Sequence, residues 1–151
     1  MRRAGVLPVE VGAEVAFHDV DLAQVAWHGH YLKYFENARW ALMARIGYTL
    51  QDMLAAGEGW PIVDLEVRYL KPARFGDRLV VRASLVEWET RLVVHYLASL
   101  AASGERVARA RTVQVAVDMP GGELRFALPA PFVTRVQAAL AAAGAHQGAG
   151  A

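Results

Sequence analysis

The amino-acid sequence predicts an α+β domain in which a curved antiparallel sheet wraps one long helix. Three observations lead to this fold class: one alternating strand opens the chain, one apolar helix candidate follows, and β-rich segments joined by short turns dominate the remainder. With 151 residues and 55% hydrophobic content, the chain suits one domain with one core. We expect this domain over residues 1–143 and a disordered tail of low complexity over 144–151.

The first strand is expected over residues 9–17, where apolar side chains alternate with polar or small ones. A loop over residues 19–29 lacks a clean period. After it, the segment YLKYFENARWALMARI carries strong helix formers and stops at Gly47. Only a narrow polar stripe interrupts the apolar surface of this helix, so we expect it to be buried.

A second alternating segment, residues 63–69, predicts a strand that closes before Pro72. Short polar stretches separate three longer β-rich segments, which describe an antiparallel meander: residues 78–88, 92–102 and 106–118. A brief strand near residues 123–127 and a helix over PFVTRVQAALAAAG complete the expected order. The edges of such a sheet favour pairing with another copy of the chain.

Composition excludes several classes of protein. Sixteen basic and fifteen acidic residues leave a net charge of +1, which provides no field for gripping nucleic acid or an anionic membrane. The chain has no cysteine, which rules out disulfides, thiolate metal sites and a cysteine nucleophile. No apolar run approaches the ~20 residues of a membrane span. We therefore expect a cytoplasmic protein without nucleic-acid partners or membrane association.

Ionisable residues gather in the segment FHDVDLAQVAWHGHYLKYFENAR, between the first strand and the helix. Asp21 could act there as a general base or attack a carbonyl directly. On composition alone, capping of a turn or helix is the better reading of Asp19 or Asp21. The unpaired amides of a helix that begins near His28 suit an oxyanion or a polarised carbonyl. Together these features permit acyl transfer without a serine.

His28 and His30 form an H-x-H pair that on a strand would place both rings on one side. At the start of a helix, two residues apart diverge by about 200° and cannot share a metal ion. We expect no metal site.

The pattern D-x-D-x-x-x-V-x-W-H-x-x-Y, followed by F-E-N-A-R, closely resembles the signature of the YbgC and 4-hydroxybenzoyl-CoA thioesterase branch of the hot dog superfamily. A second block, WPIVDLEVRYLKPARFGDRLVV, is similar to the strand after the helix in that family. The resemblance covers about residues 9–128. It implies a hot dog fold and hydrolysis of acyl-CoA thioesters without a metal or redox cofactor. It also implies an active site at the contact between two subunits.

The resemblance also implies roles for individual residues. Asp21 matches the catalytic aspartate, and Asp19 supports the loop. The backbone amide of His28 polarises the thioester carbonyl, and the His28 imidazole could assist. Val25 and Trp27 would line the acyl pocket. Tyr31 would either pack within the fold or contact the acyl group.

Three departures from the family pattern matter. Residues 22–24 read Leu-Ala-Gln, where relatives usually have a small residue and glycine, which affects the backbone of the loop. The 4-hydroxybenzoyl type has a basic run after Trp88 for the CoA nucleotide, and here only Arg91 matches it as a phosphate contact. Glu36 matches a position that is often acidic, but we expect an ion pair with a neighbour such as Arg39 rather than a catalytic role.

The sequence therefore favours a homo-oligomeric acyl-CoA thioesterase, a dimer at least and more readily a tetramer. One alternative is an acyl carrier protein thioesterase of the same fold. Another is a non-catalytic domain that binds acyl-CoA, against which Asp21 argues, because a binding domain needs no carboxylate opposite the thioester. The acyl group and the choice between base and nucleophile stay open.

Overall fold

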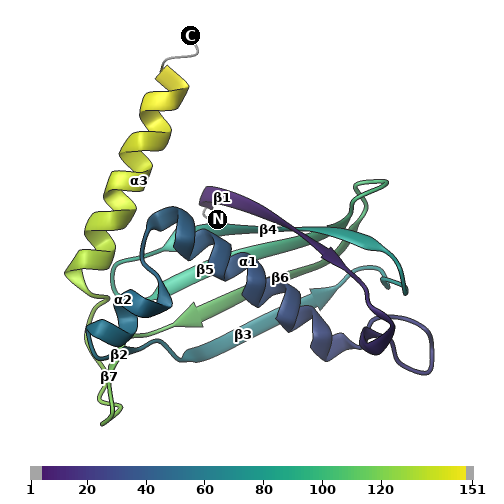
Figure 1. Cartoon of the computed structure of the whole chain (residues 1–151), viewed down its shortest axis with the longest axis horizontal. Helices are drawn as coiled ribbons and strands as arrows, with labels where there is room; N and C mark the ends of the chain where they lie inside the picture. Colours follow the sequence, from purple (N-terminus) through teal and green to yellow (C-terminus); the bar gives the residue numbers. More distant parts are fainter. Residues whose placement is uncertain (1–4, 149–151) are drawn as a thin grey trace.

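The computed structural model describes the backbone of residues 5–148 and the side chains of residues 5–145. It confirms the predicted α+β hot dog architecture: a five-stranded antiparallel sheet curves around one long helix, α1 (Tyr31–Ile46) (Figure 1). The strands follow the spatial order β1 (Val6–Glu14), β4 (Arg78–Glu87), β5 (Leu92–Leu100), β6 (Arg106–Gln114) and β3 (Ile62–Tyr69).

The smaller elements lie at the two ends of this frame. Short 3-10 turns, η1 (Phe17–Asp19) and η2 (His28–His30), flank the loop before α1. At the other end, α2 (Leu50–Ala55) leads into β2 (Glu58–Gly59), which pairs with β7 (Val117–Asp118). The last element is α3 (Ala130–Gly148), which packs against α1 and β1.

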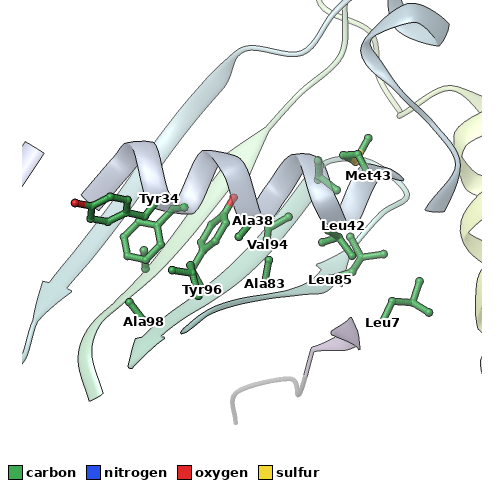
Figure 2. Packing of buried hydrophobic residues seen from close by; sticks show 14 of the residues in the cluster. Leu7, Tyr34, Ala38, Leu42, Met43, Ala83, Leu85, Val94, Tyr96 and Ala98 are labelled. Atoms are coloured by element: carbon green, nitrogen blue, oxygen red, sulfur yellow. The ribbon is translucent and has the colours of Figure 1, made fainter. Parts of the chain in front are cut away.

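The core forms where α1 lies in the concave face of the sheet. Ala38 and Leu42 of the helix point toward Val94 and Tyr96 of β5 (Figure 2), and all four are buried. Phe35, also buried, stacks near Tyr96 with ring centroids 5.2 Å apart. Burying side chains of this size contributes roughly 1.5–3 kcal/mol each. The apolar surface predicted for this helix is therefore what holds it in the sheet.

Small residues on the sheet make room for the helix. Tyr96 lies directly opposite Ala83 of β4 on one side and Ala110 of β6 on the other. Its hydroxyl shares a 2.8 Å hydrogen bond with Thr112, so the buried polar end is satisfied. A large ring between two alanines creates the shallow trough that accepts α1.

One edge of the sheet is open. Every residue of β3 except Val67 is exposed, among them the apolar Ile62 (45%), Val63 (58%) and Leu65 (41%). On its other side β3 pairs with β6. An exposed apolar edge strand is a template for pairing with another chain.

Several boundaries differ from the sequence-based expectation. The first strand ends at Glu14 because the chain turns into η1. The last β segment divides into β6 and β7, and residues 123–127 form no strand, although Leu124 makes an isolated bridge to Val117.

The expected tail over 144–151 was wrong in its first part. The C-terminal helix continues to Gly148, because an alanine-rich segment has high helix propensity and carries the helix past Gly144. Residues 149–151 lie outside the described residues. Among residues 5–148, no helix is both long and apolar enough to cross a membrane.

Gly47 ends α1 in the left-handed conformation (φ 86°), and its amide donates to the carbonyls of Met43 and Ala44 at 2.9 and 3.1 Å. A Gly47→Ala substitution should lower the free energy of unfolding by about 1 kcal/mol, since a Cβ disfavours this conformation. Urea unfolding measures the effect. Gly12→Ala is the control, because a Cβ there meets nothing within 4 Å. Equal effects at both positions would contradict this account of the helix end.

Candidate functional site

A buried aspartate anchors the loop that precedes α1. The Asp19 side chain is 1% exposed and accepts hydrogen bonds from Lys33 Nζ (2.5 Å), Tyr34 Oη (2.7 Å) and the amide of Ala16 (3.0 Å). Burial alone raises the pKa of a carboxyl group, but the hydrogen bonds from Lys33 and Tyr34 outweigh it and hold the pKa of Asp19 well below its usual range. The Asp19 carbonyl also accepts from the Trp27 amide at 2.8 Å, which closes the loop.

Asp21 stands at the exposed tip of this loop. Its carboxylate accepts a hydrogen bond from the Ala23 amide at 2.8 Å, and its carbonyl accepts from the Gln24 amide at 2.9 Å. Val20 and Ala26 form an isolated bridge at the base of the turn. The tight turn leaves most of the Asp21 carboxylate open to solvent or to a ligand.

Residues 22–24 depart from the family pattern in sequence, but the loop still forms its turn. Gln24 adopts the left-handed conformation (φ 64°), which glycine adopts at little cost. Glycine is the residue that the family pattern usually has in this loop. A residue with a Cβ pays about 1–2 kcal/mol for this conformation. The backbone thus retains its course while the Leu22 side chain projects fully into solvent.

Three of the predicted residues meet in one cavity. A hollow of about 290 Å³ lies between the start of α1 and the end of β3, and its lining includes Val25, His28 and Tyr31. The Tyr69 hydroxyl donates to the His28 carbonyl at 2.5 Å, and the Tyr31 hydroxyl accepts from the Ala73 amide at 3.2 Å. These bonds fix the beginning of the helix against the end of β3.

Trp27 lies outside the lining of this cavity. Its ring is 46% exposed and contacts His28 in a tilted arrangement and His30 edge to face, with centroids 4.8 and 5.3 Å away. Residues 5–145 contain no group of three or more histidine, aspartate or glutamate side chains placed to hold a metal ion.

A second cavity, of about 450 Å³, lies where α1, α2 and β2 meet. It is mostly apolar, but Glu36 and Arg39 contribute to its lining. The predicted ion pair between them is confirmed, with Arg39 Nη2 3.4 Å from Glu36 Oε1. The guanidinium is the buried partner, since its side chain is 8% exposed against 58% for Glu36.

Arg91 is not brought to Asp21 within one chain. It lies in the turn between β4 and β5, whereas β1 pairs Glu14 with Arg78 at the other end of β4, where the chain enters the Asp21 loop. Arg91 makes two hydrogen bonds to the Glu87 carboxylate, at 2.8 and 3.2 Å, and this contact raises the pKa of Arg91.

A larger hollow, of about 550 Å³, lies on the sheet and is lined by Arg68, His95 and Arg109 among others. None of the residues predicted for the site lines it. Its chemistry is therefore separate from that of the Asp21 loop.

Sequence reasoning missed the residues that position the loop. Lys33 and Tyr34 follow the motif closely, and a buried carboxylate requires a cation nearby, but the pattern did not reveal that Asp19 is the buried one. Tyr69 could not be assigned either, because its contact with His28 spans 41 residues of sequence.

Residues 15–140 match the family described as the thioesterase-like superfamily. A putative esterase, sll0410, from Synechocystis sp. is 28% identical, over 80% of this chain and 73% of the relative. A putative acyl-CoA thioesterase, YneP, from Bacillus subtilis is 28% identical, over 70% of this chain and 76% of the relative. The crystal structure of Slr0204, a 1,4-dihydroxy-2-naphthoyl-CoA thioesterase from Synechocystis, superposes with a TM-score of 0.77 and 26% identity, over 85% of this chain and 95% of that one.

The contrast between the two aspartates gives a stability prediction. Asp19→Asn should lower the free energy of unfolding by about 2 kcal/mol at neutral pH, because a hydrogen-bonded buried carboxylate is lost. Asp21→Asn, at the exposed tip, should change it by less than about 0.5 kcal/mol. Thermal and urea unfolding measure both.

The Asp19 effect should depend on pH. The folded-state pKa is depressed, so the stabilisation is present above the unfolded-state pKa of about 3.9 and is lost as pH falls toward the folded value. The difference between the wild type and Asp19→Asn should therefore shrink below about pH 4. A difference that stays constant down to pH 2 would contradict this role of Asp19.

Proposed function

The chain belongs to the thioesterase-like superfamily and is a thioester hydrolase with the hot dog fold, and from this premise we propose that it hydrolyses an acyl-CoA to the free acid and CoA with Asp21 as the catalytic carboxylate. The observation that carries the proposal is the arrangement around Asp19. A buried anchor places an exposed carboxylate two residues further on, at the end of the molecule where α1 begins. Similarity to proteins named as thioesterases supports an acyl-CoA substrate.

The proposed chemistry uses the start of the helix as well as the carboxylate. In this proposal the thioester oxygen accepts a hydrogen bond from the backbone amide of His28, which opens the η2 turn directly before the positive end of the α1 dipole. Asp21 then either removes a proton from an attacking water or attacks the carbonyl carbon itself. In the second route CoA leaves as a thiolate and water hydrolyses the resulting anhydride. In this proposal the exposed His28 imidazole assists by donating a hydrogen bond to the departing CoA thiolate.

We propose that the site is completed by a second copy paired along β3. A two-fold axis between Leu65 and Glu66 would place Ile62 of one chain opposite Tyr69 of the other. The approach covers the apolar side chains that β3 exposes. It would also set the 450 Å³ cavity of one chain, whose lining includes Trp60 shortly before β3, beside the Asp21 loop of its partner. The acyl group would extend into that cavity. A dimer is the minimum, and we favour a tetramer.

The proposed two-fold symmetry would also bring Arg91 of one chain to the Asp21 end of the other chain. Antiparallel pairing of two β3 strands reverses the ends of the second sheet, so the turn that holds Arg91 in one chain lies at the same end as Asp21 of the other. Trp27, exposed beside His28, would then line the acyl site together with Val25 and Tyr31. We propose Arg91 as a phosphate contact of the CoA nucleotide, in exchange with its ion pair to Glu87.

An acyl carrier protein could deliver the same thioester, and parallel assays with matched acyl-CoA and acyl carrier protein substrates separate the two donors. The absence of cysteine suits a reducing cytoplasm, which is the location we propose.

Asp21→Asn should lower kcat by about 100-fold or more, because the amide keeps the size of the side chain but neither accepts a proton at neutral pH nor attacks a thioester. The apparent Kd for acyl-CoA should change little. Steady-state hydrolysis of the best substrate in a panel of acyl-CoAs measures kcat, and calorimetry measures Kd. Near wild-type turnover would remove Asp21 from the catalytic role. If neither protein hydrolysed any acyl-CoA or acyl carrier protein thioester, a binding domain would be the better account.

Leu65→Glu should convert the oligomer into a form without the β3 contact and reduce hydrolysis to a few per cent or less, since it places a carboxylate directly opposite Glu66 of the other chain in the proposed pairing. Light scattering at micromolar concentration reports the mass. Leu124→Glu is the control, because Leu124 is 66% exposed and bridges to Val117 of β7 instead of lying on the β3 edge. An active monomer, in the wild type or in the variant, would refute a shared site.

A further inference from the structure

The outer face of the sheet carries two guanidinium groups on neighbouring strands. β3, β6 and β5 lie side by side, and α1 packs against the other face of the sheet (Figure 1). Arg68 of β3 is the register partner of Arg109 of β6. Opposite residues of an antiparallel pair point to the same face, with Cβ atoms about 4.5–5.5 Å apart. Ala110 lies beside Tyr96 on the helix side, so Arg109 and its partner point outward.

These two guanidinium groups have no counter-charge of their own. Neither Arg68 nor Arg109 makes an ion pair or a side-chain hydrogen bond within residues 5–145. Like charges directly opposite each other destabilise a sheet. An anion held between the two side chains would therefore remove a repulsion and form charge-assisted hydrogen bonds at the same time.

The pair lies at one end of the hollow on the sheet. Both arginines line this hollow of about 550 Å³, a volume typical of small-molecule sites. Leu97 of β5 lies opposite Arg109, whereas Val93 lies opposite Glu87 at the other end. Roughly 13 Å of strand separates Leu97 from Val93. The hollow therefore has room for an organic group beside an anion at the arginine pair.

Carboxylates confine the uncompensated positive charge to that end. Glu66 lies opposite Arg111, and Asp64 approaches the same guanidinium at 3.6 Å, so this third cation is already compensated. Glu87 lines the far end, where it contacts Arg91. A long polyanion or an anionic bilayer laid over the hollow would meet Glu66 and Glu87. A small anion, by contrast, needs only the arginine pair.

We propose that this hollow is a second ligand site, which binds a small molecule that ends in a diphosphate group. The planar guanidinium groups of Arg68 and Arg109 each donate two parallel hydrogen bonds to one of two adjacent phosphates. The organic group of the ligand lies along β5, over Leu97 and His95. This site is separate from the Asp21 loop, and edge-to-edge pairing along β3 leaves the outer face open.

Calorimetry of the full chain with inorganic pyrophosphate, at fixed ionic strength, tests the site. Pyrophosphate should bind more tightly than orthophosphate. Arg68→Gln and Arg109→Gln should each raise its Kd by about 10-fold or more, because each variant loses charge-assisted hydrogen bonds. Arg82→Gln is the matched control, since Arg82 carries the same charge on the same face but lies opposite Glu10 and outside the lining. Its Kd should change by less than about 2-fold.

Thermal unfolding gives a second measurement on the same variants. Without ligand, Arg68→Gln and Arg109→Gln should each unfold about 1–3 °C above the wild type, because a like-charge repulsion is removed. Pyrophosphate should raise the Tm of the wild type and of Arg82→Gln, but not that of the two lining variants. A lower Tm in both lining variants without ligand would contradict the repulsion from which the site is inferred.

Two diphosphate esters distinguish the sources of the ligand. ADP carries a nucleoside, whereas isopentenyl diphosphate carries a small branched alkyl group. The ester that binds more tightly than pyrophosphate identifies the organic group. Weaker binding of both esters than of pyrophosphate would overturn the assignment of an organic group to the hollow.

Other results would overturn the site itself. Absent pyrophosphate binding, or an equal Kd in the wild type and both lining variants, would do so, as would binding of heparin or anionic vesicles without binding of pyrophosphate. A change of oligomeric mass in both lining variants, seen by light scattering, would assign the face to contact between copies of the chain. An equal rise in the Kd of CoA and of pyrophosphate in Arg109→Gln would assign the hollow to the substrate nucleotide. Asp21→Asn should bind pyrophosphate as the wild type does, whatever its effect on hydrolysis.

Discussion

The rest of the site depends on the hydrogen bonds that hold the buried carboxylate of Asp19. Lys33 and Tyr34, in the first turn of α1, are its partners, so the loop and the helix move as one piece. The helix is in turn fixed by the trough that alternating large and small residues form in the sheet. Asp19 therefore holds the loop in place, and the exposed Asp21 is the residue to which we assign the proposed chemistry. A loop tethered only by its turn could not present Asp21 to a thioester reproducibly.

The sheet gives the protein two distinct faces and one unfinished edge. Its concave face is occupied by α1, and one of the described cavities lies at each end of this helix. One end holds Asp21, and the other holds the apolar cavity near Trp60, so a single chain keeps the two parts of the proposed acyl site apart. The antiparallel geometry of the open β3 edge supplies a simple way to bring the parts of two chains together.

Much of the fold could be predicted because its signals are local. Alternation and helix propensity located the strands and α1, and the ion pair between Glu36 and Arg39 followed from their spacing of three residues. The D-x-D pattern indicated Asp21, but not that Asp19 would be the buried one. The meeting of Arg39, Trp60 and Gln114 could not be predicted, since Gln114 contacts Trp60 across 54 residues of sequence. The C-terminal helix was expected to end at residue 144 because the tail has low complexity, whereas α3 continues to Gly148, since alanines on both sides of Gly144 sustain the helix.

The open β3 edge has a consequence for how the protein is made. Without the proposed second chain, Val63 and Leu65 present unpaired backbone and apolar surface to any extended segment in the cell. Correct pairing is second order in concentration and competes with aggregation during synthesis. Folding yield should therefore be governed by the rate of chain encounter as well as by the stability of the single domain. The charged side chains of Asp64 and Glu66 alternate with the apolar positions of β3. They would slow nonspecific association of this strand with other chains before the proposed pairing forms.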